Sequence, residues 1–354
     1  MMFLNLKIYG FVKELILLNI GLKIIHKMKE KIIFTNGLID LAQPRLGTKV
    51  VYKTDDFFAS ANRIISPTIP VFKEGVFDKH GKWMDGWESR RKRTSGHDYI
   101  ILKLGKPGKI SKIDVDTSHF NGNQPAMVSI EGAFSNSNKI NQLKWISILT
   151  KKRVRANSHH FFSIKNKKIF SHIKFNIFPD GGVARLRLYG SIAKSKKIIN
   201  KKINLASLLD GASVIACNNE HFGKAENILA PGKAKNMGDG WETRRRRGKG
   251  NDWLILNSID GNSIDKIEIS THHFKGNFPS YCSLQAAYLP SKSSKKVVSS
   301  SNKWKYLLKN TKLSANKTHK FKNSLMRKDK INHIKINIFP DGGISRFRIF
   351  GKKI

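Results

Sequence analysis

A block of nine residues occurs twice in this 354-residue chain. Asp85 to Arg93 reads Asp-Gly-Trp-Glu-Ser-Arg-Arg-Lys-Arg, and Asp239 to Arg247 reads Asp-Gly-Trp-Glu-Thr-Arg-Arg-Arg-Arg. Two further blocks recur in the same order, Thr-x-His-Phe-x-Gly-Asn from Thr117 and Asn-Ile-Phe-Pro-Asp-Gly-Gly from Asn176. The copies stand 154 to 161 residues apart. Such a spacing is far too long for a solenoid repeat, and it indicates a duplicated domain.

The repeats divide the chain into segments. We predict an apolar and basic leader at 1–30, which we interpret as a non-native extension ahead of Met28. The first repeat is then expected at 31–190, a basic linker at 191–202 and the second repeat at 203–354. The spacing between the copies grows after residue 277, so the run Ser291 to Ser301 is predicted to be an exposed loop.

Each copy has the pattern of short β-strands. Ile113-Asp114-Val115 and His172 to Phe178 alternate apolar and polar side chains, as half-buried strands do. Pro179-Asp180-Gly181-Gly182 is typical of a tight turn, since proline fixes φ and glycine accepts positive φ. No long amphipathic helix follows the leader. We therefore predict an all-β protein built from two tandem β-sandwich domains.

The chain is strongly basic, with 66 Lys and Arg residues against 25 Asp and Glu, a net charge of +41. Such a charge is typical of nucleic-acid binding. Here the lysines are scattered among Ile and Asn residues, as in Lys194 to Lys202, which an A+T-rich coding sequence would also produce. We therefore expect small anions, and not nucleic acid, to be the partners that this charge attracts.

Cysteine content and hydropathy bear on the cell compartment. Two cysteines, Cys217 and Cys282, are too few for a disulfide framework, which favours a reducing, cytoplasmic environment. No uncharged apolar run approaches the 18 or so residues of a spanning helix, so we expect no membrane association.

The first repeated block supplies candidate site residues. Glu88 is a candidate acid or base, and Trp87 is a candidate for a flat apolar surface that lines the substrate site. Arg90 and Arg91 are candidates for binding a carboxylate through paired hydrogen bonds. Their counterparts in the second copy are Glu242, Trp241, Arg244 and Arg245. The alternative is a solvated loop whose tryptophan anchors it to the core while its arginines face water.

The second repeated block adds a histidine that titrates near neutrality. His119 is a candidate proton carrier that Asp116 would orient, and Asn123 can bond a ureido or carboxylate group. The counterparts are His273 and Asn277, whereas Ser270 replaces the acid. A turn glycine and a structural histidine explain this block equally well. Two ligands make no metal site, so none is predicted. Arg185 and Arg346 either reach a pocket or face outward from their strands.

The ordered, duplicated motifs resemble allantoicase (allantoate amidinohydrolase), from about residue 31 to the end. Leu38 to Ala42, Asp55 to Ala59 and Lys82 to Glu88 fit the same resemblance. It implies two jelly-roll domains similar to galactose-binding folds, and hydrolysis of allantoate to ureidoglycolate and urea in purine degradation. We expect no cofactor, although a metal requirement stays open, and we expect a homo-oligomer.

Under this resemblance each candidate residue has a role in handling allantoate. Arg90 and Arg91 would hold the carboxylate, Asn123 a ureido group, and Glu88 with His119 would transfer protons. Ser270 puts equal activity of the two copies in doubt. A non-catalytic module that binds a small anion or a carbohydrate remains the alternative, because fold does not fix function.

Overall fold

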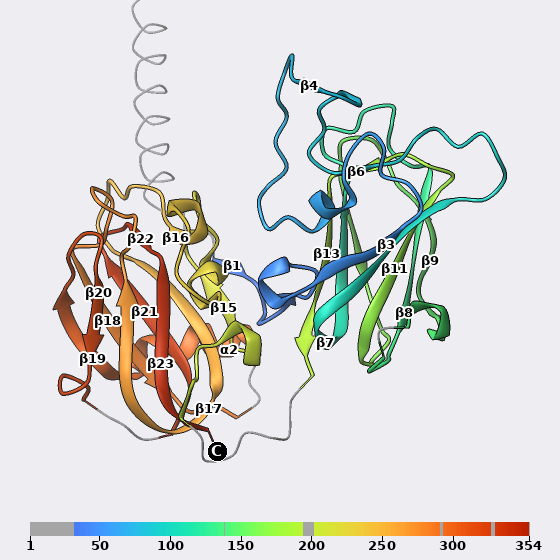
Figure 1. Ribbon diagram of the computed structural model, residues 1–354. Coiled ribbons are helices and arrows are strands. Elements are labelled where there is room, and N and C mark those ends of the chain that lie inside the picture. The colour runs from blue at the N-terminus through green and yellow to red at the C-terminus, as the bar shows by residue number, and fades with distance from the viewer. Residues whose placement is uncertain (1–31, 138, 194–201, 291–292, 327–329, 354) are drawn as a thin grey trace, which may run out of the picture.

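The computed structural model describes residues 32–137, 139–193, 202–290, 293–326 and 330–353. Two β-rich bodies lie side by side, one blue to green and one yellow to red (Figure 1). The predicted all-β fold with two tandem sandwiches is confirmed. The expected leader at 1–30 and most of the expected linker lie outside the described residues.

The first repeat is built around one eight-stranded sheet. Its strands are β2 (Ile39–Asp40), β3 (Lys49–Lys53), β7 (Asp98–Asp116), β8 (Met127–Ala133), β9 (Ile146–Arg153), β10 (His159–Ser163), β11 (Phe170–Phe178) and β13 (Arg185–Ile192). The main order is β2-β13-β7-β11-β8-β9, with β3 and β10 also paired to β7.

The long strand β7 contributes to both layers of the sandwich. Its first half pairs with β3 and β11, and its second half pairs with β10 and β13. Gly105 lies between the halves, where the Leu46 carbonyl oxygen is 2.1 Å from the position a Cβ would take. Ile113 and Val115 are fully buried, as the alternating pattern predicts, but Asp114 between them is buried too, so this part of β7 is covered on both faces and is not half-buried as expected.

The second repeat has the same plan in a nine-stranded sheet. Its strands are β1 (Ile33–Phe34), β14 (Lys202–Asn204), β15 (Ser213–Cys217), β17 (Asp252–Ser270), β18 (Tyr281–Ala287), β19 (Lys305–Lys312), β20 (Thr318–Phe321), β21 (Ile331–Phe339) and β23 (Arg346–Lys353). The strand β17 is the counterpart of β7, since it pairs with β15 and β21 first and with β20 and β23 later.

The strand β1 crosses from the first repeat to the second. Ile33 pairs with Cys217 and Phe34 with Ala216, in antiparallel register with β15. The sequence placed residue 31 onward in the first repeat, so this assignment is wrong for the β1 strand. The added strand covers the edge of β15, which is buried along its whole length, whereas the corresponding edge strand β3 is largely exposed.

The serine- and lysine-rich run of the second repeat contains the short helix α2 (Ser294–Ser300). The sequence predicted an exposed loop, and this prediction is wrong for the helical residues. Val297 is buried in a small cluster with Trp304 and Ile215, on the outer face of the sheet. An apolar pair, Val297-Val298, inside a polar run was the signal for a packed turn of helix.

The first and last of the repeated motifs lie in short two-stranded pairs that join segments distant in sequence. The two-stranded pairs are β6 (Trp87–Glu88) with β12 (Gly182–Val183), β16 (Trp241–Glu242) with β22 (Gly343–Ile344), and β4 (Phe77–Asp78) with β5 (Gly81–Lys82). The 3-10 helices are η1 (Pro44–Leu46), η2 (Ala61–Ile65), η3 (Ile140–Gln142), η4 (Leu208–Asp210), η5 (Ala225–Leu229), η6 (Met237–Asp239) and η7 (Ser301–Lys303). In Figure 1, β6 and β16 lie toward the upper ends of the two bodies.

The segment before the repeated block differs between the copies. From Ser66 to Met84 the first repeat carries the projecting hairpin β4–β5, at the top of Figure 1. The corresponding segment of the second repeat, Ala230 to Gly238, is ten residues shorter and has no such hairpin. In the described part of the chain, no helix is both long and apolar enough to span a membrane.

Candidate active site

Glu88 and Asn123 form a direct pair at the end of the first sandwich. Asn123 Nδ2 donates a hydrogen bond of 2.8 Å to Glu88 Oε1, although the residues are 35 positions apart. Glu88 is held by β6, whose pairing with β12 ties it to the turn after β11. Burial raises the pKa of Glu88, and the bond from Asn123 offsets part of that rise. Glu242 and Asn277 form the same pair in the second repeat.

Close packing explains the glycines of these motifs. Phe120 is fully buried beside Gly182, where a Cβ would lie 2.0 Å from the ring, and beside Gly86, where it would lie 2.8 Å away. Phe274 stands in the same relation to Gly343 and Gly240. The aromatic ring of the Thr-x-His-Phe block therefore locks the glutamate strand and the Pro-Asp-Gly-Gly turn into one unit. Gly181 of this turn has φ +126°, as the turn prediction required.

Trp87 and Trp241 belong to the hydrophobic core and do not line an open site. Both side chains are fully buried. Trp87 Nε1 donates to the Asp55 carbonyl over 2.7 Å, and Trp241 Nε1 donates to the Asn219 carbonyl over 2.7 Å. The predicted substrate-binding role of the two tryptophans is wrong, and their alternative role as loop anchors is the one observed.

Arg90 is already paired with a carboxylate. Its Nε lies 2.7 Å from Asp55 Oδ2, and its guanidinium lies 5.2 Å from the centre of the Phe57 ring. Burial favours a higher pKa for Asp55, but hydrogen bonds from the backbone of Phe57 and from Arg90 outweigh it and lower the pKa. Arg91 is exposed beside this pair. The sequence showed Asp55 only as part of the family resemblance, and did not identify it as a partner of Arg90.

The second repeat leaves its first arginine without this acid. Asn219 stands in place of Asp55 and accepts from the backbone nitrogen of Arg244. The Arg244 side chain lies 3.2 Å from His221 Nδ1, and an open pocket of about 650 Å³ lies beside it. Arg245 is exposed. Cationic groups therefore reach solvent next to the glutamate strand in both repeats.

His119 and His273 both adopt a left-handed backbone conformation. Their φ angles are +68° and +73°, which is uncommon for a residue other than glycine. The backbone N–H of His119 donates a 2.9 Å hydrogen bond to the side-chain oxygen of Asn157, and that of His273 donates one of the same length to Asn316. The shared strain at one loop position in two copies is typical of a functional site.

The two imidazoles contact the segment that precedes the repeated block. His119 Nε2 lies 3.3 Å from the Pro70 carbonyl oxygen, and its ring stacks on Phe72. His273 Nε2 lies 2.9 Å from the Ala234 carbonyl oxygen. Among the described residues, no hydrogen bond joins His119 to Glu88.

Asp116 does not orient His119. Its Oδ1 accepts from the backbone nitrogen of Ser118 over 2.8 Å, and its Oδ2 lies 3.7 Å from Nε2 of His159. His159 Nδ1 in turn lies 2.9 Å from Asp114 Oδ2. The predicted Asp116–His119 pair is therefore wrong. The strand register brings His159 opposite Asp116, and only the pairing of β10 with β7 reveals this partner.

Arg185 and Arg346 are both buried and act as internal clamps. Arg185 is almost fully buried, and its NH2 group lies 2.7 Å from Asp85 Oδ2. Arg346 NH2 lies 2.6 Å from Asp239 Oδ2. Arg185 alternates with Leu186 and Leu188 in its strand, as expected, and Arg346 alternates with Phe347 and Ile349. The segment before each repeated block covers both arginines, which donate to its carbonyl oxygens.

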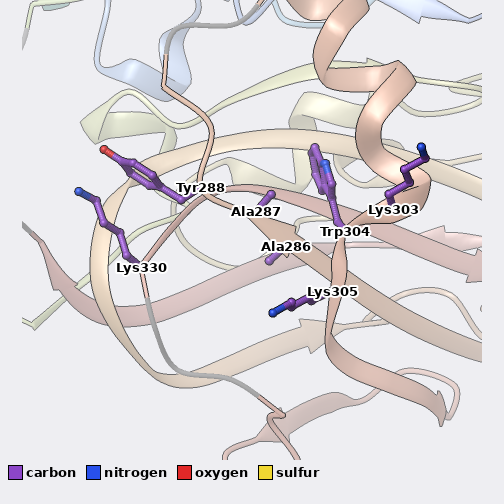
Figure 2. Close-up of a pocket in the computed structure, with 7 residues that line it drawn as sticks. All are labelled: Ala286, Ala287, Tyr288, Lys303, Trp304, Lys305 and Lys330. Atoms are coloured by element: carbon purple, nitrogen blue, oxygen red, sulfur yellow. The ribbon is translucent and has the colours of Figure 1, made fainter.

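A separate depression of about 470 Å³ lies on the second body, away from these motifs. Figure 2 shows Tyr288 and Trp304 in it, with the side chains of Lys303, Lys305 and Lys330 around them. Across the described part of the chain, no three His, Cys, Asp or Glu side chains gather as a metal site would require.

Most of this chain is similar to known proteins. A family model described as the allantoicase repeat matches residues 39–193 and 203–354. A protein named probable allantoicase from Pseudomonas fluorescens is 47% identical over 317 residues, covering 89% of this chain and 96% of that protein. One from Acinetobacter baumannii is 46% identical, covering 90% and 94%. The crystal structure of allantoicase from Saccharomyces cerevisiae matches with a TM-score of 0.76 and 32% identity, covering 90% of this chain and 94% of that one.

Proposed function

The chain belongs to the allantoicase family, and we propose that it is a hydrolase that converts allantoate to ureidoglycolate and urea in purine degradation. The observation that carries the proposal is the Glu–Asn pair, which occurs at the same end of both repeats. Allantoate bears two ureido groups and a carboxylate, so its site needs amide contacts, a cation and a proton carrier. The non-catalytic alternative is not favoured.

We assign proton transfer to Glu88. Burial raises the pKa of Glu88, which favours the protonated carboxyl relative to that of a solvated glutamate. A protonated Glu88 can donate its proton to the departing urea nitrogen as the bond between that nitrogen and the central carbon breaks. Water forms the new C–O bond at the same carbon, and the proton it loses restores the Glu88 carboxyl. Such general acid catalysis is typically worth about 10²–10⁴-fold. Asn123 holds the Glu88 carboxyl in place and presents its amide oxygen to a ureido group.

We assign the substrate carboxylate to Arg90 and Arg91 in the first site. Arg91 is exposed, and Arg90 keeps NH groups beyond the one that bonds Asp55. The net charge of +41 attracts the anion toward either site. His119 and His273 are proposed as proton carriers, held by their strained loops at the edge of each site. In the second site, Glu242, Arg244, Arg245 and Asn277 take the corresponding roles.

Urea release from allantoate tests the assignment. The wild-type chain should release urea, and the double variant Glu88→Gln with Glu242→Gln should lose about 10²-fold or more in kcat. The loss of activity in each single variant measures how much its own site contributes to the total rate of urea release. Glu74→Gln is the matched control, because Glu74 is exposed and the substitution removes the same charge. A wild-type chain that releases no urea refutes the activity, and a fully active double variant refutes the role of the glutamates.

The same assay addresses the cofactor. We propose that no metal or organic cofactor takes part, and urea release that is unchanged after dialysis against a chelator would agree with this. Activity that falls with the chelator and returns with a divalent cation would contradict it.

We propose a cytoplasmic homo-oligomer. Both cysteines, Cys217 and Cys282, are buried free thiols, which fits a reducing compartment. The segment from Ser66 to Met84, which carries the projecting hairpin, exposes Ile69, Phe72 and Phe77, and this supports self-association. Light scattering coupled to size exclusion measures the mass, and a monomer at micromolar concentration would contradict the oligomer.

A further inference from the structure

The segment Pro231–Asp239 borders the second candidate site and leads directly into it. The Ala234 carbonyl lies 2.9 Å from His273 Nε2, and Met237 Sδ lies 3.8 Å from Asn277 Nδ2. Asp239 ends η6 and is followed by Gly240 and the β16 strand that carries Glu242. The groups that hold this segment therefore also set the position of the site residues.

Two guanidinium groups hold Asp239, and they come from different repeats. Arg346 NH2 lies 2.6 Å from Asp239 Oδ2, within the second repeat. Arg45 NH2, from η1 of the first repeat, lies 2.5 Å from Asp239 Oδ1. The side chains of Arg45 and Asp239 are only 22% and 13% exposed, so this pair is more sheltered than an ordinary surface ion pair.

Arg45 also holds the far side of the segment. Its NH1 donates to Asn227 Oδ1, and Asn227 Nδ2 donates to the carbonyl oxygens of Gly238 and Gly240 over 3.3 and 2.9 Å. One guanidinium thus fastens the segment both through the Asp239 carboxylate and through the Asn227 amide. The planar group with its several NH donors suits two acceptors at once, which an ammonium group does not match.

In the first repeat, the segment before the repeated block is held, among the described residues, by those of that repeat alone. Its segment before the repeated block is held by Arg63, whose NH1 donates to the Met84 carbonyl over 2.6 Å. Arg63 is the third residue of η2 and Asn227 the third residue of η5, so the two occupy equivalent positions. In the second repeat asparagine stands there, and Arg45 supplies the guanidinium from the other repeat. In the described chain, Asp85 bonds only to residues of its own repeat.

We propose that Arg45 is a positioning residue for the second candidate site, which is therefore complete only when the first repeat is docked against it. The inference rests on the proposed function for its catalytic consequence alone. Its structural part concerns the order of the segment 231–242 and can be measured without any substrate. The first site, by contrast, does not depend on the second repeat.

Hydrogen exchange on the full chain tests the structural part. Arg45→Met keeps an unbranched apolar stem and removes the donors, and Asp239 keeps Arg346, so the fold should persist. We expect about tenfold faster exchange in peptides spanning 231–242, as for loss of a charge-assisted hydrogen bond, and no change in 67–88. Arg63→Met is the matched control and should give the reverse pattern. Unchanged exchange in 231–242 for Arg45→Met would overturn the proposal.

Kinetics in single-site backgrounds tests the catalytic part. With Glu88→Gln, urea release reports the second site, and Arg45→Met should lower its kcat about tenfold with little change in KM. Arg45→Lys should restore part of the loss, because one donor can still reach Asp239. With Glu242→Gln, Arg45→Met should have no effect. An equal loss in both backgrounds would overturn the positioning role. A wild-type chain without activity would refute the proposed function, while the exchange result would still decide on Arg45.

Discussion

Glu226 provides a direct test of the electrostatics between the repeats. It lies in η5, partly buried, and its Oε1 accepts from Gln43 Nε2 of the first repeat over 3.3 Å. Burial, and next the charge of Asp40, raise the pKa of Glu226 to about 7, although Gln43 and Arg45 act in the opposite direction. The unfolded chain should show the ordinary value of 4.5. The folded state therefore holds this proton more tightly than the unfolded state.

The sign and size of the effect on stability follow from that difference. The group costs nothing below about pH 4.5, where it is protonated in both states. As pH rises from 4.5 to about 7, the unfolded chain releases the proton first and the free energy of unfolding falls. At 1.36 kcal/mol for each pH unit, the full cost above pH 7 is about 3 kcal/mol, and about 2 kcal/mol once residual solvent contact is allowed for.

Glu226→Gln should remove this cost. The amide oxygen still accepts from Gln43, and position 226 no longer carries a negative charge that Asp40 would repel. We expect the variant to be about 2 kcal/mol more stable than wild type at pH 8 and equal to it at pH 4.5. Urea denaturation followed by tryptophan fluorescence at both pH values measures the difference, with Glu74→Gln as the exposed control. A gain of equal size at both pH values, or a loss at pH 8, would refute the reasoning.

Three further predictions concern the sites and the surface. Asp55→Asn should lower KM for allantoate several-fold, because it releases Arg90 from its carboxylate; an increase in KM measured by initial rates would count against Arg90 as the clamp. Gly182→Ala should destabilise the chain by more than about 2 kcal/mol in denaturant titrations, since the new methyl would overlap the Phe120 ring, whereas Gly248→Ala, in open space, should not. Despite its charge, the protein should elute from immobilised DNA below about 0.15 M salt; retention up to about 0.5 M would revive nucleic-acid binding.

Local patterns in the sequence were sufficient for the fold class. The alternation at Ile113-Asp114-Val115 identified β7 as a strand, although Asp114 is buried as well, and the Pro179-Asp180 turn joins β11 to β12. Strand and turn patterns of this kind depend only on residues close in sequence. Because the domain is duplicated, the two copies gave two independent instances of each pattern. The helix α2 was missed because a single buried residue, Val297, anchors it within an otherwise polar run.

Contacts between distant residues decided the site, and these were only partly predictable. The sequence selected Glu88 and Asn123 as candidates, and the structure brings them together. It wrongly joined Asp116 to His119 because they are close in sequence, whereas the strand register gives Asp116 to His159. The role of Arg45 was invisible, because its partner lies 194 residues away and the other repeat uses a different residue for the same task.

The pairing of β1 with the sheet of the second repeat limits where the chain can be cut into two separate halves. Because Ile33 and Phe34 complete the sheet of the other half, a cut through the linker would leave two fragments still fastened to each other by a borrowed strand. A shortened gene beginning at residue 203 would produce a half with the hydrogen-bonding rim of β15 uncovered, ready to pair with any extended chain it meets. Although the chain is a duplicated unit, the strand β1 joins its two halves to each other.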